Sequence, residues 1–166
     1  MIEMRIESVR VSLMSPNQVV ILKELDGERR LPIFIGKAEG DAIAFRLNND
    51  VVIPRPLTHD LAANVLGALD AKVTQVVIND LRSQHFFAAI HVESHGNEVV
   101  LDVRPSDALA IAVRVDCPIY AQPHVLDEAG VLLPADHNDA EPGTGNVGAF
   151  DDFISSLDLS DLDEDK

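Results

Sequence analysis

The sequence predicts an α+β protein in which a β-β-β-α unit occurs twice, with one helix inserted between the copies. Three observations lead to this prediction. Short apolar stretches alternate with turn residues in two blocks of three, and each block is followed by an amphipathic segment. Segment 39–47 aligns without gaps with segment 107–115, sharing an acid, an Ala-Ile-Ala centre and an arginine. An acidic stretch follows the second block and predicts an acidic C-terminal tail. We expect the strands to form mixed or antiparallel sheets.

The first block predicts three strands and a helix. The strands are expected at 6–11, 19–22 and 31–35. The first of them alternates apolar and polar residues with a period of two, as a half-buried strand does. The helix is predicted over 37–47, directly after Gly36, with Ala42, Ile43 and Leu47 facing the core.

The inserted helix is predicted over 57–69. Thr58 is the expected N-cap, and Asp60 falls in the first turn, where a carboxylate complements the helix dipole. Leu61, Val65 and Leu69 recur at four-residue steps, which predicts a buried stripe.

The second block repeats the pattern of the first. Its strands are predicted at 73–78, 85–92 and 99–103, with a further strand at 118–121. A turn is expected at 94–97, where Ser-His-Gly-Asn stands between the second and third strands of the block. Ser106 is the expected N-cap of a helix over 107–115.

Length and charge indicate one domain followed by a tail. The 166 residues suit a single domain over 1–126, a linker over 127–149 and an acidic tail over 150–166 with a short amphipathic helix. The net charge is −15, but residues 127–166 hold twelve acids and one base, whereas residues 1–126 hold sixteen acids and twelve bases. The nearly balanced body permits phosphate binding, but it has no strong basic stripe for tight nucleic-acid binding.

The compartment predicted from the sequence is the cytoplasm. The first residues lack the apolar core of a signal peptide, and no apolar run reaches membrane-spanning length. The single cysteine, Cys117, excludes an intrachain disulfide and a cysteine metal cluster. We interpret it as a buried structural thiol.

Two short motifs share one pattern: RPLTHD at 55–60 and RPSDAL at 104–109. Each has Arg-Pro, a hydroxyl residue and an acid at an expected helix start, and helix capping alone accounts for that pattern. The functional interpretation is that Arg55 and Arg104 bind a phosphate near two helix N-termini, where free backbone N–H groups favour an anion. Structural ion pairs are the alternative for both arginines.

Three acids fall in first helical turns: Glu39, Asp60 and Asp107. If the helices converge, these carboxylates could hold a divalent cation such as Mg²⁺ or Mn²⁺ for phosphodiester hydrolysis. Acids that merely complement the helix dipoles are the structural alternative. The sequence has no P-loop, no dinucleotide fingerprint and no serine-hydrolase elbow.

Three longer motifs resemble one known family. LPIFIGKAEGDAIAFRL, RPLTHDL and LDVRPSDALAIAVRVDCPIYAQPHVL closely resemble the bifunctional nuclease domain family, in the family's order and spacing over residues 1–126. Gly40 stands where alanine is usual in the family, a mild cost to a helix. The resemblance implies an α+β fold of duplicated units, self-association into a dimer or larger homo-oligomer, and nuclease activity on both RNA and DNA.

Carried onto this chain, the resemblance gives eight candidate site residues: Glu39, Arg55, Thr58, His59, Asp60, Arg104, Ser106 and Asp107. We expect His59 to act as general acid or base and the three carboxylates to orient it or hold a metal. Arg55 and Arg104, with the hydroxyls of Thr58 and Ser106, would bind the phosphate.

Two other functions fit the same residues. The first is a non-enzymatic oligomeric module that binds a protein or a small anionic ligand, with the arginines and acids serving as ion pairs between helices. The second is a regulator whose acidic tail mimics nucleic acid.

Overall fold

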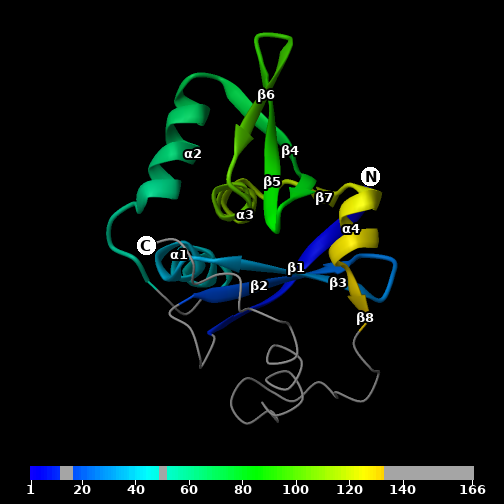
Figure 1. Cartoon of the computed structure of the whole chain (residues 1–166). Coiled ribbons are helices and arrows are strands. Elements are labelled where there is room, and N and C mark those ends of the chain that lie inside the picture. Colours follow the sequence, from blue (N-terminus) through cyan, green and yellow to red (C-terminus); the bar gives the residue numbers. More distant parts are fainter. Residues whose placement is uncertain (12–16, 49–51, 133–166) are drawn as a thin grey trace. The chain divides into compact units, whose positions relative to one another are not determined.

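The computed structural model describes residues 1–11, 17–48 and 52–132, and it has the predicted α+β class. The described strands form one sheet in the order β6-β5-β4-β7-β1-β2-β3-β8 (Figure 1). These strands are β1 (Ile2–Val11), β2 (Gln18–Glu24), β3 (Arg29–Ile35), β4 (Ala71–Arg82), β5 (His85–Ser94), β6 (Asn97–Val103), β7 (Ile119–Ala121) and β8 (Val131–Leu132). The helices are α1 (Lys37–Leu47), α2 (Thr58–Ala68), α3 (Pro105–Val115) and α4 (Pro123–Ala129).

The sheet consists of two antiparallel meanders joined through β7. Strands β1, β2 and β3 pair in sequence, as do β4, β5 and β6. β7 joins them because it runs antiparallel to β1 and parallel to β4, which makes the sheet mixed. Each meander is followed in the chain by one helix, α1 or α3, and α2 lies between α1 and the second meander in sequence. This order agrees with the predicted pattern, while a common origin of the two units stays a prediction.

Helix α3 lies at the centre of the body. It contacts α1, α2, β4 and β5 (Figure 1). Its residues Ala108 to Ala112 are buried. The core combines this helix with aliphatic side chains from both meanders, among them Leu22, Leu31, Ile78 and Ile90. The largest buried side chains are leucines, isoleucines and valines, so aliphatic packing fills the core.

The predicted core face of α1 is confirmed in part, whereas that of α2 is wrong. Ala42 and Ile43 are buried as predicted, but Leu47 at the end of α1 is exposed. Leu61, Val65 and Leu69 of α2 are all exposed. α2 lies on α3 and β4 with its opposite face, from which Leu66 packs against the core. The four-residue spacing therefore identified an apolar stripe correctly but not the direction in which it points.

Both helix starts also differ from the prediction. α2 begins at Thr58 after the N-cap Leu57, and the Asp60 carboxylate accepts a hydrogen bond from the Leu57 N–H (Oδ2–N 2.8 Å). α3 begins two residues earlier than predicted, with Arg104 at the N-cap and Pro105 at the first position. Ser106 is therefore a buried helical residue, not a cap, because the proline already fits the first helical position without an N–H.

The body extends past the predicted strands. Helix α4 packs against β3 and β4, and β8 pairs with β3, although neither α4 nor β8 was predicted. The turn before β6 has positive φ at His95 and Gly96, which suits the predicted hairpin. The predicted tail helix lies outside the described residues.

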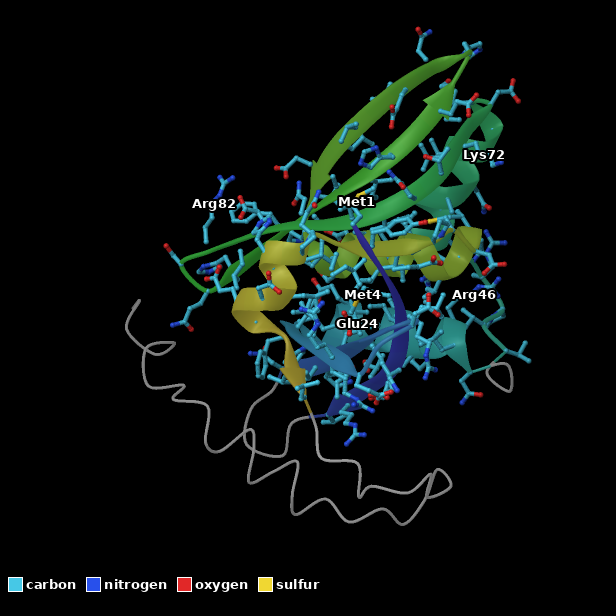
Figure 2. The ribbon with its side chains drawn as sticks, turned by 90° about the vertical axis from the view of Figure 1, so that its right-hand side faces the viewer. Met1, Met4, Glu24, Arg46, Lys72 and Arg82 are labelled. Atoms are coloured by element: carbon cyan, nitrogen blue, oxygen red, sulfur yellow. The ribbon has the colours of Figure 1, made fainter. Side chains whose placement is uncertain are left out.

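Figure 2 labels charged side chains on the two opposite sides of the body. Arg46 at the end of α1 and Lys72 near the start of β4 lie on the side where α2 runs, while Arg82 lies on the opposite side. Among the described residues, no helix is long and apolar enough to span a membrane.

Candidate functional site

Three helix starts converge on one charged cluster. Glu39, His59 and Asp107 stand in the first turns of α1, α2 and α3, and the Arg104 guanidinium joins two of them. Arg104 contacts Glu39 (Nη1–Oε1 3.1 Å) and Asp107 (Nε–Oδ2 2.8 Å), and His59 contacts Asp107 (Nε2–Oδ1 3.1 Å). Four of the eight predicted site residues therefore form one connected network.

The pair of His59 and Asp107 is the part of the network suited to proton transfer. The His59 side chain is only 15% exposed, and its Nε2 lies against the Asp107 carboxylate. If Nε2–H donates a hydrogen bond to this carboxylate, Nδ1 keeps a lone pair that can accept a proton. Burial pushes the pKa of Asp107 upward, but hydrogen bonds from Arg104 and His59 outweigh it and hold that pKa below its ordinary value. Asp107 is thus a carboxylate at neutral pH and can orient the imidazole.

Arg104 is the most solvent-exposed residue of the cluster. Its side chain is 66% exposed, and a second nitrogen also reaches Asp107 (Nη2–Oδ1 3.2 Å). The hydrogen bond to Asp107 is the main reason that the pKa of Arg104 is raised. The guanidinium has five N–H groups, so some remain for an anion after these contacts.

Asp60 faces away from this network toward a residue not predicted for the site, Arg114. Its Oδ1 accepts a hydrogen bond from Arg114 Nε at 2.6 Å, while the other nitrogens of Arg114 donate to the carbonyl oxygens of Ala110 and Ala42. The Arg114 side chain is only 4% exposed. Arg114 is therefore hydrogen-bonded to residues of α1, α2 and α3.

The effect on Asp60 follows from these contacts. Burial raises the pKa of Asp60, but the hydrogen bonds from the Leu57 N–H and Arg114 have the larger combined effect. The pKa of Asp60 therefore lies below its ordinary value. The alignment of 39–47 with 107–115 contained a signal for Arg114, since it matches Arg46. It was not singled out because nothing in the sequence distinguishes the buried arginine of the pair from the exposed one.

The remaining predicted residues lie outside the network. Arg55 is exposed, and no hydrogen bond or ion pair joins it to any other residue that the structure describes. Thr58 is exposed at the first position of α2, whereas Ser106 is buried. The Thr58 residue is therefore accessible to a ligand from solvent, whereas Ser106 is not.

The predicted acids do not gather into a metal-ligand set. Over residues 1–11, 17–48 and 52–132, no three His, Cys, Asp or Glu side chains lie together in a way that could hold a metal ion. Asp60 is occupied by Arg114, and Arg104 lies between Glu39 and Asp107. The donor set does not fit a divalent cation.

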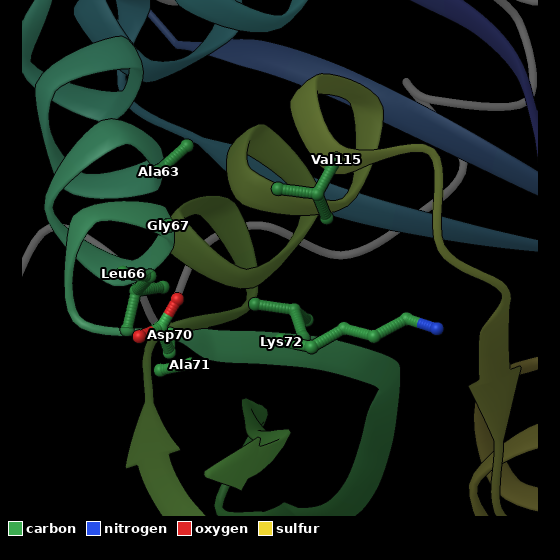
Figure 3. Close-up of a pocket in the computed structure, with 8 residues that line it drawn as sticks. Ala63, Leu66, Gly67, Asp70, Ala71, Lys72 and Val115 are labelled. Carbon is green, nitrogen blue, oxygen red and sulfur yellow. The ribbon is translucent and has the colours of Figure 1, made fainter.

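Two hollows flank α2, one near each end. A hollow of about 210 Å³ beside its start is lined by Phe45, Arg46, Ile53, Leu57, Asp60 and Arg114. A second hollow, of about 440 Å³, lies at the other end and is lined by Ala63, Leu66, Gly67, Asp70, Ala71, Lys72, Val73 and Val115. Figure 3 shows these residues around it. Only the first hollow includes a predicted site residue, Asp60.

The fold and the cluster define a small α+β protein whose charged site is built at three helix starts. Residues 20–134 match the family model of the bifunctional nuclease domain. The chain belongs to this family.

Relatives lie in bacteria and in plants. An uncharacterized protein of Mycobacterium tuberculosis is 38% identical over 164 residues, covering 96% of this chain and 97% of the relative. Proteins named bifunctional nuclease 1 of Oryza sativa subsp. indica and bifunctional nuclease 2 of Arabidopsis thaliana are each 26% identical over 123 residues. Those alignments cover 72% of this chain but 37% of each plant protein.

Proposed function

We propose that the protein is a nuclease that hydrolyses phosphodiester bonds of RNA and DNA. The observation that carries the proposal is the contact between His59 and Asp107 beside the exposed Arg104. It combines a group able to move a proton with a cation able to bind a phosphate. Membership of the bifunctional nuclease domain family and the names of the plant relatives support the same chemistry.

Each residue of the network has a role in this proposal. His59 takes a proton from the attacking water, and Asp107 holds the ring and stabilises the imidazolium that forms. Arg104 binds the phosphate and offsets the negative charge that develops on it, and Glu39 holds the guanidinium in place. Asp60 fixes the start of α2 through Leu57 and Arg114, and thereby the position of His59.

Other expectations from the sequence remain proposals. Arg55 and Thr58 are exposed and are assigned to binding the phosphate chain outside the network, whereas the buried Ser106 is assigned to the start of α3. We assign the protein to the cytoplasm as a homo-oligomer. The proposed roles include no metal ligand, because the acids do not assemble as ligands in the described part of the chain.

The His59→Ala change tests the proposal. Removing a general base typically slows the chemical step by about 10²–10⁴-fold, so we expect a loss of this size with the fold retained. The measurement is the cleavage rate of labelled single-stranded RNA and DNA, with and without magnesium or manganese.

The matched control is His91→Ala. His91 also pairs with a carboxylate, since its Nδ1 lies 2.8 Å from Glu98 Oε1, but this pair lies on β5 and β6 away from the helix starts. Cleavage that persists equally in both variants would come from a contaminating nuclease or another site, and the assignment of His59 would then be wrong.

A second function is favoured by one observation: the charges of the network are paired with one another. Arg104 contacts two carboxylates, as expected for ion pairs that hold helices together. In that case the protein is an oligomeric module that binds a protein or a small anionic ligand. Highly purified protein that cleaves neither RNA nor DNA under any of these conditions would favour this function over the nuclease.

A further inference from the structure

The exposed apolar side chains of the body are concentrated around α2. Among the described residues, seven of the fifteen exposed large apolar side chains fall within positions 45–69. Three of them, Leu61, Val65 and Leu69, are 59%, 48% and 63% exposed and form a ridge along α2. No residue between Asp60 and Asp70 is charged. A contiguous apolar surface of this kind usually marks an interaction site.

The ridge lies on the outer side of α2. The inner side faces α3 and β4 (Figure 1). Leu66 is the described α2 residue that packs against the core. No α2 residue is buried, although most of the helix is apolar. A helix with this composition needs a second cover, and the described part of the chain supplies only one.

The sequence of the ridge is symmetric about Val65. Leu61 and Leu69 stand four residues before and after it, and the small residues Ala62 and Ala68 stand three residues before and after it. On a helix, Ala62 and Ala68 therefore form shallow grooves on the two flanks of the ridge. Ridges that pack into grooves are the ordinary way in which two helices associate.

This symmetry is what a two-fold axis requires. When two copies of α2 run antiparallel with Val65 facing Val65 of the second copy, each Leu61 meets the Leu69 of the other helix. The same patch then serves both partners, as in an isologous dimer. In this register the exposed Asp70 of each copy comes opposite Asp60 of the other, whose charge Arg114 already offsets, near the positive N-terminal end of that helix.

The surface continues beyond the ridge. Phe45 and Ile53 are exposed and line the hollow of about 210 Å³ at the start of α2, together with Leu57. The antiparallel arrangement places the Leu69 end of the second copy beside this hollow. Additional area is needed because a stable interface usually buries about 800 Å² on each partner.

We infer that the exposed face of α2 docks a second copy of this chain, through an antiparallel α2–α2 contact with its two-fold axis at Val65. The inference does not depend on nuclease activity. It specifies which surface pairs and in which register.

The test is the mass of the full chain in solution, measured by sedimentation velocity and light scattering over a range of concentrations. Unmodified protein is expected to form a two-chain species. Val65→Asp and Val65→Lys are each expected to weaken association on the order of a hundredfold or more, because like charges would meet at the axis. An equimolar mixture of the two variants is expected to restore the two-chain species, since opposite charges then face each other.

The control is Val100→Asp, on an exposed valine of strand β6 at the edge of the sheet. It is expected to leave association unchanged, with circular dichroism and thermal unfolding confirming the fold of every variant. Val65→Cys avoids a charge altogether and is expected to form a disulfide-linked pair under mild oxidation, whereas the unmodified chain, with only Cys117, is not.

Several results would overturn the inference. They are a single-chain mass at every concentration, a two-chain species that survives Val65→Asp, a mixture that does not re-associate, or loss of the dimer in Val100→Asp. A single-chain species that binds phospholipid vesicles through Leu61 and Val65 would assign the ridge to a membrane surface instead.

Discussion

At the scale of single residues, Gly40 shows how one position is set by its neighbour. It is a buried glycine at the fourth position of α1. An ideal Cβ at this position would lie 2.0 Å from Oε1 and 2.9 Å from Cβ of Gln18. Gln18 is itself buried and donates to Asp41 (Nε2–Oδ1 2.7 Å). The glycine therefore makes room for a polar contact between β2 and α1.

We predict that Gly40→Ala lowers the free energy of unfolding by about 1–3 kcal/mol, as overpacking of a filled site usually does. Helix propensity alone would give a gain of about 1 kcal/mol, so the two effects have opposite signs. Urea unfolding at equilibrium measures the difference.

Gly67→Ala is the matched control, because a Cβ at Gly67 in α2 meets nothing within 4 Å. It should raise the free energy of unfolding by up to about 1 kcal/mol. A gain of the same size in Gly40→Ala would show that Gln18 moves aside without cost.

At the scale of elements, Arg114 connects the three helices that supply the candidate site. It contacts Asp60 of α2, the Ala42 carbonyl of α1 and the Ala110 carbonyl of its own helix α3. His59 follows Thr58 and precedes Asp60, so the contact that holds Asp60 also fixes the imidazole beside Asp107. The geometry of the site thus depends on a buried arginine that touches none of its proton-transfer groups.

We predict that Arg114→Met lowers the free energy of unfolding by about 3–5 kcal/mol, since it leaves the Asp60 carboxylate without its partner. Denaturant unfolding measures this loss. Arg46→Met is the control. Arg46 is the matching arginine of α1, but it is exposed and acts on Asp60 only through its charge, without a hydrogen bond, so its change should stay within about 0.5 kcal/mol. Equal losses in the two variants would mean that the buried contact with Asp60 contributes little.

Most elements could be predicted from local patterns, because period-two alternation and helix-start residues are local properties. The strands of both meanders and helix α1 were found at or near their positions in this way. Short elements such as β8 were missed because two residues carry no periodicity, and their position depends on pairing with β3. For the site, the network of Glu39, Arg104 and Asp107 was predicted as a set of residues, but not its contacts.

The outward ridge of α2 could not be predicted for a different reason. An apolar stripe such as Leu61, Val65 and Leu69 looks the same in sequence whether it meets the core or a second chain. Only packing decides between them, and here Leu66 and the small residue Ala63 turn toward the body instead. Likewise, sequence gave no basis for choosing between Arg46 and Arg114, because burial distinguishes them and it is a tertiary property.

At the scale of the whole molecule, ionisable groups limit stability on both sides of neutral pH. Hydrogen bonds from Arg29, Lys37 and Arg82 hold the pKa values of Glu24, Asp41 and Asp80, in that order, below their ordinary values. Burial alone would raise the pKa values of the two site carboxyls at 60 and 107, but their hydrogen bonds also bring them below the ordinary values. Their folded pKa values are lower than their unfolded ones, so their contribution is complete above about pH 4 and is lost as pH falls.

Cys117 acts in the opposite direction at alkaline pH. Burial raises the pKa of its thiol to about 11, whereas a thiol in the unfolded chain titrates at about 8.5. Between these two values the folded state binds more protons than the unfolded state, so stability falls as pH rises. The same half-buried thiol should react slowly with alkylating reagents at neutral pH, because the thiolate is the reactive form.

We therefore predict that the free energy of unfolding is highest between about pH 5 and 8 and declines on both sides. Denaturant unfolding from pH 3 to 10.5 measures the profile, and Cys117→Ser isolates its alkaline part. The acid decline should remain in that variant, because the carboxylates are unchanged, whereas the decline above about pH 8.5 should become shallower. Identical alkaline slopes in the two proteins would show that Cys117 titrates alike in the folded and unfolded chains, and that its burial has no effect on stability at high pH.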